Sequence, residues 1–286
     1  MSAFSVMFSI LILTKDEEHN IGDCLRSVEW CDDIVVLDSF SSDATCEIAK
    51  TTGARVFQRA FDDFGAQRNF ALEKIPFNNA WVFHLDADER FNEALQRECE
   101  RVIAEDHFSA FFVPNRIIFL GRWIRHSTQY PYPQVRLVKR GEVRFAKSGH
   151  GQREEQVKRG VGSIDTPYDH LNFSKGLADW VAKHNRYSTA EALEFLQSER
   201  SLPLTGLLSR DPMERKRCLK SLHARLPGRW MWKFFYLYLV RGGFLDGNPG
   251  FAYCLLQAFY DFLISVKICE LRAAVEHESL AKKRGS

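Results

Sequence analysis

The stretch that most constrains the fold of this chain is WVFHLDADER, residues 81–90. Mostly apolar residues run into Asp86, Asp88 and Glu89, as a buried strand runs out into a loop. Carboxylates in this position lie at the carboxyl end of a central strand, where open α/β sheets bind their ligands. Two carboxylates one residue apart can face one hard divalent cation, which then completes its shell with phosphate oxygens. The stretch therefore indicates a metal that carries a diphosphate, unless it is only an acidic loop capping a helix that begins near Asn92.

Strands and helices alternate before this loop. Apolar runs of strand length, each followed by a helical pattern, occupy residues 8–13, 33–37 and 55–58. Of the helices between them, the first is predicted to be capped by Asn20, the second by Asp43, and the third contains residues 66–71. Such alternation predicts a doubly wound, mostly parallel α/β sheet with right-handed crossovers.

The composition is that of a globular protein and excludes several other classes. Of the 286 residues, 45% are hydrophobic and 13% aromatic, which is ample for a buried core. Basic and acidic residues nearly cancel, 39 against 37, so the overall charge indicates no nucleic-acid partner. Seven cysteines without a Cys-x-x-Cys pair fit core packing in a reducing compartment. The N-terminal apolar run lacks a basic region and a cleavage site, and is predicted to be a strand rather than a signal peptide.

Three polar clusters fall at carboxyl ends of predicted strands: residues 14–18, 38–43 and 86–89. Each has an ordinary alternative, since Thr14 could simply end a strand and Asp38 could form an Asx-turn. The sequence has no Gly-rich phosphate loop, so metal and basic side chains would have to meet phosphate charge. This disfavours dehydrogenases and P-loop enzymes.

Four segments of the first 95 residues carry a recognisable pattern. In order, they are SILILTKDEEHNIGDCLRSV, VVLDSFSSDAT, AQRNFAL and HLDADER. Together they resemble the inverting family 2 glycosyltransferases, which have the GT-A fold. The resemblance implies that Thr14 and Glu17 lie near the nucleotide and that Asp38 recognises the base of a nucleoside diphosphate sugar. It also implies that Arg68 and Asn69 flank the nucleotide pocket. Asp86 and Asp88 would contact the ribose and a Mg²⁺ or Mn²⁺ ion, with Asp88 as the direct metal ligand. The chain departs from many relatives at Phe40, where they carry Gly after Asp-Ser.

Beyond the metal loop the pattern changes to a helix and shorter strands. Residues 92–105 look helical, and apolar runs at 110–113 and 117–120 are predicted strands that would line the acceptor side. Residues 134–139 alternate as a half-buried strand does. This pattern leaves Arg136 on the polar face and predicts a solvated guanidinium.

Residues 148–155, SGHGQREE, are predicted to form a flexible polar loop. Family members that elongate lipopolysaccharide cores carry a His-Glu loop here, and KHNRYS at 183–188 also resembles theirs, although the usual Val-His-Glu order is absent. An inverting displacement needs a carboxylate base on the acceptor side, and the candidates are Glu154, Glu155, Asp165 and Asp169. Glu154 is preferred because neighbouring glycines let the loop close over a donor, and because it stands nearest the relatives' His-Glu position. His150 could bind phosphate or metal, and a plain surface loop is the alternative.

The C-terminal third is different in kind. Residues 210–229 are crowded with Arg and Lys, and residues 230–240 are aromatic and apolar without an acidic residue, as interfacial segments are. Residues 251–268 form an apolar helix. Its narrow polar stripe consists of Gln257, Asp261 and Ser265. The first run is too short to span a bilayer and the second carries Asp261 near its middle, so lying in one leaflet is favoured over spanning. A pair of core helices is the alternative. GFLDGNPGF weakly extends the resemblance to lipopolysaccharide-core enzymes.

These observations predict a GT-A catalytic domain over residues 1–200 and a C-terminal helical, membrane-associating region over 201–286. The catalytic domain would divide into a nucleotide-binding half, 1–95, and an acceptor half, 96–200. The expected function is metal-dependent, inverting transfer of a hexose from a nucleoside diphosphate sugar, UDP-linked by the resemblance, to a saccharide or lipid-linked acceptor. The resemblance places it in bacterial envelope polysaccharide or lipopolysaccharide synthesis, peripheral on the inner face of the cytoplasmic membrane.

Two alternatives stay open at this point. The chain could be a catalytically inactive, membrane-bound scaffold that only binds a sugar nucleotide. It could also be a haloacid-dehalogenase-type phosphatase, but such enzymes carry Thr or Val two residues after the second Asp, where this chain has Arg90.

Overall fold

The computed structural model describes residues 7–148, 151–198, 215 and 228–284. It divides into two compact units. The first comprises Met1–Trp123 and Gln129–Lys175, and the second comprises Ile124–Thr128 and Gly176–Ser286. The boundary therefore lies at residue 175 and not at the predicted residue 200, because helix α5 (Gly176–Ser198) packs with the C-terminal helices.

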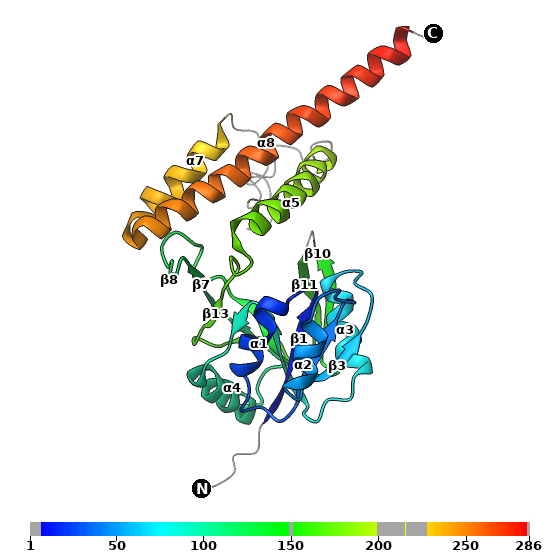
Figure 1. Cartoon of the computed structure of the whole chain (residues 1–286), viewed down its shortest axis with the longest axis vertical. Helices are drawn as coiled ribbons and strands as arrows, with labels where there is room; N and C mark the ends of the chain where they lie inside the picture. The colour runs from blue at the N-terminus through cyan, green and yellow to red at the C-terminus, as the bar shows by residue number, and fades with distance from the viewer. Residues whose placement is uncertain (1–6, 149–150, 199–214, 216–227, 285–286) are drawn as a thin grey trace. The chain divides into compact units, whose positions relative to one another are not determined.

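A seven-stranded sheet runs through the first unit (Figure 1). Its strand order is β12-β6-β9-β4-β1-β2-β3. β9 runs antiparallel between β4 and β6, and all the other neighbouring pairs are parallel. The predicted doubly wound, mostly parallel sheet is thus confirmed, as are its first three strands. The strands are β1 (Phe8–Thr14), β2 (Ile34–Asp38), β3 (Arg55–Gln58), β4 (Trp81–Asp86), β6 (Ala110–Val113), β9 (Gln134–Lys139) and β12 (Val161–Ser163).

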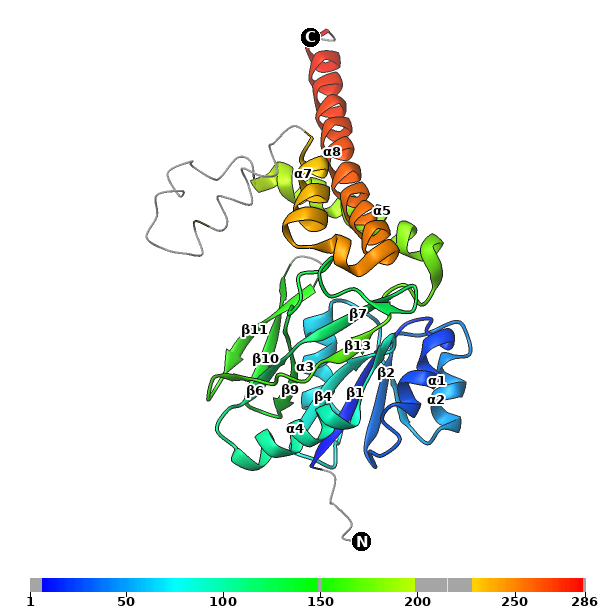
Figure 2. The same cartoon turned by 90° about the vertical axis from the view of Figure 1, so that its left-hand side faces the viewer.

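Helices cover both faces of this sheet, which is why its central strands β1, β2 and β4 are mostly apolar (Figure 2). Ile10 and Ile12 of β1 pack in one core cluster with Ile21 of α1, whereas Leu11, between them, packs in another cluster with Leu72 of α3. Successive strand residues point to opposite faces, so one apolar run fills two cores. The helices are α1 (Glu18–Arg26), α2 (Thr45–Thr51), α3 (Phe64–Lys74) and α4 (Glu93–Glu105).

Of the two predicted helix caps, Asp43 contacts the start of its helix and Asn20 does not. The Asp43 carboxylate accepts a hydrogen bond from the backbone N–H of Thr45, the first residue of α2. At the start of α4, the Asn92 side chain accepts a hydrogen bond from the backbone N–H of Leu95. Asn20 does not cap α1, which begins two residues earlier. Its side-chain amide donates instead to the Glu17 carboxylate, 2.7 Å away.

A small sheet and a hairpin complete the first unit. The small sheet has the order β5-β13-β7-β8, and β10 pairs antiparallel with β11 in the hairpin. The predicted flexible loop at 148–155 is therefore wrong for residues 151–155, because Gly151–Val157 pairs along β10 as a strand. The elements are β5 (Glu89–Arg90), β7 (Asn115–Phe119), β8 (Arg122–Trp123), β10 (Val143–Ser148), β11 (Gly151–Val157) and β13 (Tyr168–His170).

The second unit is helical. Around a core that includes Ala192, Ile264 and Ile268, α5 packs against α8. Asp246 is buried and accepts hydrogen bonds from the backbone N–H groups of His126 and Ser127, so residues 124–128 belong to this unit. Its remaining elements are α7 (Arg229–Phe235), a π-helical turn η2 (Tyr236–Val240), a 3-10 turn η3 (Gly243–Asp246) and α8 (Gly247–Arg284).

Candidate active site

The predicted polar clusters meet at one edge of the main sheet. Thr14 and Asp38 are register partners at the ends of β1 and β2, and the Thr14 hydroxyl donates to Asp38 over 3.0 Å. On the other side of β1, Asp86 ends β4 and is the register partner of Leu13. Because parallel strands end together, polar residues far apart in the sequence share one site.

Asp38 is completely buried and holds the turn after β2. Its carboxylate accepts hydrogen bonds from Thr14, from the backbone N–H and hydroxyl of Ser41, and from the Gln58 amide. Burial opposes its ionisation, but the hydrogen bonds from Ser41 and Gln58 outweigh burial and lower its pKa. Phe40, where relatives carry Gly, has a positive φ of 60° and an exposed ring. Because Asp38 has no exposed surface, its carboxylate shapes this turn and is not free to contact the base of a nucleotide.

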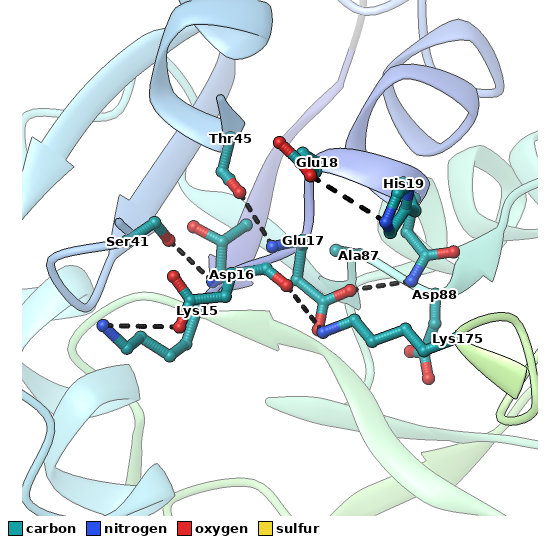
Figure 3. Close-up of polar contacts among 12 residues, drawn as sticks. Lys15, Asp16, Glu17, Glu18, His19, Ser41, Thr45, Ala87, Asp88 and Lys175 are labelled. Carbon is teal, nitrogen blue, oxygen red and sulfur yellow. Dashed lines mark hydrogen bonds and ion pairs between the residues drawn. The ribbon is translucent and has the colours of Figure 1, made fainter. Parts of the chain in front are cut away.

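The loops after β1 and β2 are tied together by hydrogen bonds (Figure 3). The Asp16 backbone N–H donates to the Ser41 hydroxyl at 2.8 Å, and the Asp16 carboxylate accepts from the Ser42 N–H at 2.7 Å. The Glu17 N–H donates to the Thr45 hydroxyl at 2.7 Å. The nucleotide side predicted from two separate motifs is therefore one connected surface.

Lys175, the last residue of the first unit in the sequence, also contacts this surface. It was not predicted from the sequence. Its ammonium group donates to the Glu17 carboxylate at 2.6 Å and to the Asp16 carbonyl at 2.7 Å (Figure 3). The pKa of Glu17 is raised, because burial and the negative charge of Asp88 outweigh the stabilisation by Asn20 and Lys175. Glu17 is thus held between a lysine and the acidic loop.

Arg136 is the main correction to the sequence analysis. Its side chain is only 2% exposed, and its guanidinium contacts Asp86 Oδ2 at 3.1 Å and Glu89 Oε1 at 2.6 Å. It also lies over the Tyr168 ring, 5.1 Å from the centroid. The expectation of a solvated arginine is wrong because residues 135–138 of β9 are all buried, so both faces of this strand are covered.

Two arginines fix the first carboxylate of the acidic loop. Besides Arg136, Arg68 of α3 lies 3.5 Å from Asp86 Oδ1. Burial disfavours the Asp86 carboxylate, but the two arginines outweigh burial and hold its pKa well below the usual range. Glu89, the last residue of the predicted acidic cluster, accepts from the Asp86 backbone N–H at 2.8 Å, and burial raises its pKa to about 7. Asp86 is therefore ionised and oriented by the protein itself.

Asp88 and His170 form the pair best suited to a metal. His170 Nε2 lies 3.3 Å from Asp88 Oδ2, both side chains are partly exposed, and the Leu171 N–H donates to the Asp88 carbonyl. The charge of Asp88 outweighs burial and raises the pKa of His170 to about 9. Among the described residues no group of three His, Cys, Asp or Glu side chains is arranged to hold a metal. One carboxylate and one imidazole fit a Mn²⁺ or Mg²⁺ ion that takes its other ligands from a diphosphate and water. His150, the other predicted metal ligand, lies outside the described residues.

The remaining predicted residues lie on β11, α3 and β13. Glu154 is the register partner of Phe145 in the hairpin. Two residues earlier on β11, the side-chain oxygen of Gln152 accepts a hydrogen bond from the Arg68 guanidinium. Alternate strand residues share a face, so Glu154 is on the side that faces Arg68. Exposed Glu155 has the neighbouring position, and Arg144 Nε is 3.8 Å from its carboxylate.

Asp169 and Asn69 have partners of their own. Arg116 Nε donates to the Asp169 carboxylate at 2.6 Å, and Asp169 precedes His170 in β13, which turns the two side chains to opposite faces. The Asn69 amide exchanges two hydrogen bonds with the backbone of Phe145, so Asn69 fastens α3 to the hairpin. Asp165 is exposed between β12 and β13.

The fold agrees with the comparisons to known proteins. The sequence profile described as Glycosyl transferase family 2 matches residues 9–156, more than half of the chain. The chain belongs to this family: it is a glycosyltransferase with the GT-A fold. Lipopolysaccharide core biosynthesis glycosyltransferase LpsC of Rhizobium meliloti is 26% identical over 272 residues, covering 93% of each chain. An uncharacterized glycosyltransferase of Rickettsia typhi is 28% identical over 273 residues, covering 92% of this chain and 87% of the relative.

Solved structures also match at low identity. S. aureus TarS 1-349 in complex with UDP-GlcNAc is 14% identical, with a TM-score of 0.44, and the match covers 94% of this chain and 92% of TarS 1-349. The family match and the similarity to LpsC confirm that the chain is a family 2 glycosyltransferase resembling lipopolysaccharide-core glycosyltransferases, as predicted from the four N-terminal segments. They exclude the phosphatase alternative.

Proposed function

We propose that this enzyme transfers a hexose, with inversion, from a UDP-sugar to a saccharide or lipid-linked acceptor in lipopolysaccharide or related envelope polysaccharide synthesis. The name of LpsC, a lipopolysaccharide core biosynthesis glycosyltransferase that aligns over nearly the whole chain, supports the acceptor class. The observation that carries the proposal is the Asp88–His170 pair beside an Asp86 fixed by two arginines, at the sheet edge that binds ligands in this fold.

Asp88 and His170 would hold a Mg²⁺ or Mn²⁺ ion, which when bound offsets charge on the leaving diphosphate and is worth several kcal/mol as a Lewis acid. The residues of the chain supply orientation. Arg136 and Arg68 fix Asp86 for the nucleotide, and Asp38 fixes the turn after β2.

Glu154 is the proposed general base. It would take the proton of the acceptor hydroxyl as the oxygen attacks the anomeric carbon. The carbon–oxygen bond to the diphosphate breaks in the same displacement, so the anomer inverts. Glu155 and Asp169 are the other candidates, but Asp169 is paired with Arg116 and Glu155 lies on the opposite strand face from Glu154.

Donor turnover with and without metal tests the reaction. Release of nucleoside diphosphate from UDP-sugars is expected with Mn²⁺ or Mg²⁺ and is expected to stop with a chelator. Asp88→Asn should abolish it while leaving the thermal unfolding midpoint nearly unchanged, because Asp88 lies in a partly exposed loop. Mn²⁺ binding in the presence of UDP, followed by electron paramagnetic resonance, should weaken in the same variant. An inactive scaffold would release no nucleoside diphosphate at all.

The location at the inner face of the cytoplasmic membrane is part of the proposal. The basic and aromatic residues from 210 onward support it. Among the described residues, the helix over Gly243–Ala274 is long and apolar enough to cross a membrane by length and composition alone, which is weak support because core helices pass the same test.

A further inference from the structure

Helix α8 has two apolar faces, and only one of them is used for packing. Cys254, Ala258, Ile264 and Ile268 are buried inside the second unit. Five large residues spaced three or four apart are exposed: Phe251, Leu255, Phe259, Phe262 and Val266. This spacing places them in one stripe along the helix, separate from the buried residues.

The polar stripe of α8 does not face water. Gln257, Asp261 and Ser265 are all half-buried, the Ser265 hydroxyl donates to the Asp261 carbonyl, and the Arg229 guanidinium lies 3.5 Å from the same carbonyl. A core helix of a soluble protein turns its polar side outward. Here the polar residues are half-buried and the exposed stripe is apolar, which is the reverse arrangement.

The exposed stripe continues onto α7 and η2 across aromatic contacts. The Trp230 and Phe262 rings lie 5.7 Å apart, and the Phe234 and Phe251 rings 5.9 Å apart, so the two helices present neighbouring side chains. The exposed residues of α7 and η2 include Trp230, Met231, Trp232, Phe235, Leu239 and Val240, with Trp232 60% and Val240 75% exposed. We name the stripe of α8 together with these six residues the apolar face. An exposed apolar surface spread over two helices marks an interaction site.

Charge indicates the partner. Residues 228–245 contain Arg229, Lys233 and Arg241 and no acidic residue, and the sequence of 210–229 has seven Arg or Lys against two Asp or Glu. Anionic lipid headgroups attract such a segment, with about 1 kcal/mol for each basic residue near the surface. Packing of two copies through the same face would bring these cations together, which is unfavourable.

Contacts of α8 with α5 oppose a spanning arrangement. The Tyr260 hydroxyl donates to Glu191 at 2.8 Å, and the Lys267 ammonium donates to the Asn185 side chain at 2.7 Å. α5 carries charged residues along its length and cannot enter hydrocarbon. Spanning by α8 would separate it from α5 and break these hydrogen bonds.

We propose that the apolar face lies in the interfacial layer of an anionic bilayer, with α7 and α8 parallel to the membrane plane and α5 on the water side. This orientation adds detail to the membrane location in the proposed function, and it rests on that proposal for the choice of the cytoplasmic membrane. The geometry makes the enzyme monotopic: it enters one leaflet by the outer sides of two packed helices.

Depth measurements test the orientation directly. In the full-length chain carrying Trp230→Phe and Trp232→Phe, a single reporter tryptophan is introduced as Phe251→Trp or as Val266→Trp. These positions are fifteen residues apart, so in a spanning helix their depths differ by about 22 Å. In a helix lying in the plane, lipids brominated near the glycerol should quench both reporters equally, and more than lipids brominated at the chain ends. Unequal depths, with one reporter near the bilayer centre, would overturn the proposal.

Binding measurements test the partner. Binding to phosphatidylcholine vesicles that contain phosphatidylglycerol, measured by flotation, should weaken about tenfold for Trp232→Glu and further for Trp232→Glu/Leu239→Glu. In each variant a charge replaces an apolar side chain that the bilayer would bury. Phe61→Glu, at an equally exposed phenylalanine of the first unit, should not weaken it. Equal binding by all variants, or loss of a dimer without loss of flotation, would overturn the proposal.

A separate readout keeps this inference apart from the proposed reaction. Release of nucleoside diphosphate is measured without vesicles for the parent and for Trp232→Glu/Leu239→Glu, and the two rates should agree. Normal release without flotation of the parent would refute the membrane face alone. Flotation without release would refute the proposed reaction alone.

Discussion

At the scale of single residues, the site depends on charges that are buried together. Arg136 faces two carboxylates, Asp86 and Glu89, and is itself almost without exposed surface. Breaking such a group by removing one member leaves a buried charge unpaired, whereas removing both charges is far less costly. This difference separates the structural role of Arg136 from its role in orienting Asp86.

Arg136→Met is therefore expected to destabilise the protein by roughly 3–5 kcal/mol, and Arg136→Met/Glu89→Gln should recover most of that loss. Transfer should not recover, because Asp86 has lost the guanidinium that orients it in both variants. Denaturant unfolding and initial rates at varied donor concentration measure the two effects, and kcat/KM for the donor should stay at least about tenfold low in the double variant. Recovery of both stability and kcat/KM would show that Arg136 only neutralises Glu89.

The identity of the base is tested by matched amides on β11. Glu154→Gln should lower turnover by about 10² to 10⁴ with donor affinity unchanged, because a general base contributes by that factor. Glu155→Gln, one position along the strand and on its other face, is the control and should stay near the parent rate. Full turnover in Glu154→Gln with loss in Glu155→Gln or in Asp169→Asn would move the base to that residue.

The sequence identified the acidic loop but not the residues that hold it. Asp86 and Asp88 follow an apolar strand, which is a local pattern, whereas Arg136 lies fifty residues on and its burial depends on the position of β9 in the sheet. His170 and Lys175 lie in a segment without any local motif. Their proximity to Asp88 and Glu17 comes from the pairing of β13 with β5, which no sequence period encodes.

At the scale of elements, the segment from β13 to Lys175 connects the metal loop with the nucleotide loops. His170 contacts Asp88, and Lys175 contacts Glu17 and the Asp16 carbonyl. Hydrogen bonds to charged groups contribute about 1.5–3 kcal/mol, so loss of Lys175 should loosen the loop after β1.

Lys175→Met is expected to raise the donor KM by about tenfold, equivalent to about 1.4 kcal/mol, with a smaller change in kcat. Lys175→Arg should retain most of the affinity, because its guanidinium can still donate to Glu17. Steady-state kinetics with saturating acceptor measures both. A lower unfolding free energy in Lys175→Met without any change in KM would make Lys175 a purely structural contact.

Long regular elements were predicted well, and the ones set by distant pairing were not. The strands β1 to β4 follow from apolar runs, and α4 (Glu93–Glu105) matches the helix predicted over residues 92–105. β11 was mistaken for a loop because GQREEQV is polar with two glycines nearby, and only pairing with VRFAKS makes it a strand. The prediction of a loop rested on local composition, because the pairing partner of β11 cannot be identified from its own sequence.

At the scale of the whole molecule, the boundary between the units could not be found from composition. α5 has charged residues along its length and carries KHNRYS, which the resemblance had joined to the catalytic unit. Its burial partners, however, are Ile264 and Ile268 of α8. Residues 124–128 leave the first unit and join the second through Asp246, a connection with no signal in the sequence.

Two units with separate cores should unfold as two calorimetric transitions that respond to different changes. UDP with Mn²⁺ at a hundred times its dissociation constant should stabilise the first unit alone by about 2.7 kcal/mol, since its proposed ligands all lie there. Asp246→Ala should destabilise the second unit alone, because it leaves the buried N–H of Ser127 and the N–H of His126 without their acceptor, at about 1–3 kcal/mol for each group. Scanning calorimetry of the parent and the variant, each with and without ligand, gives the four combinations. Movement of both transitions together under either change would show that the chain unfolds as one cooperative body.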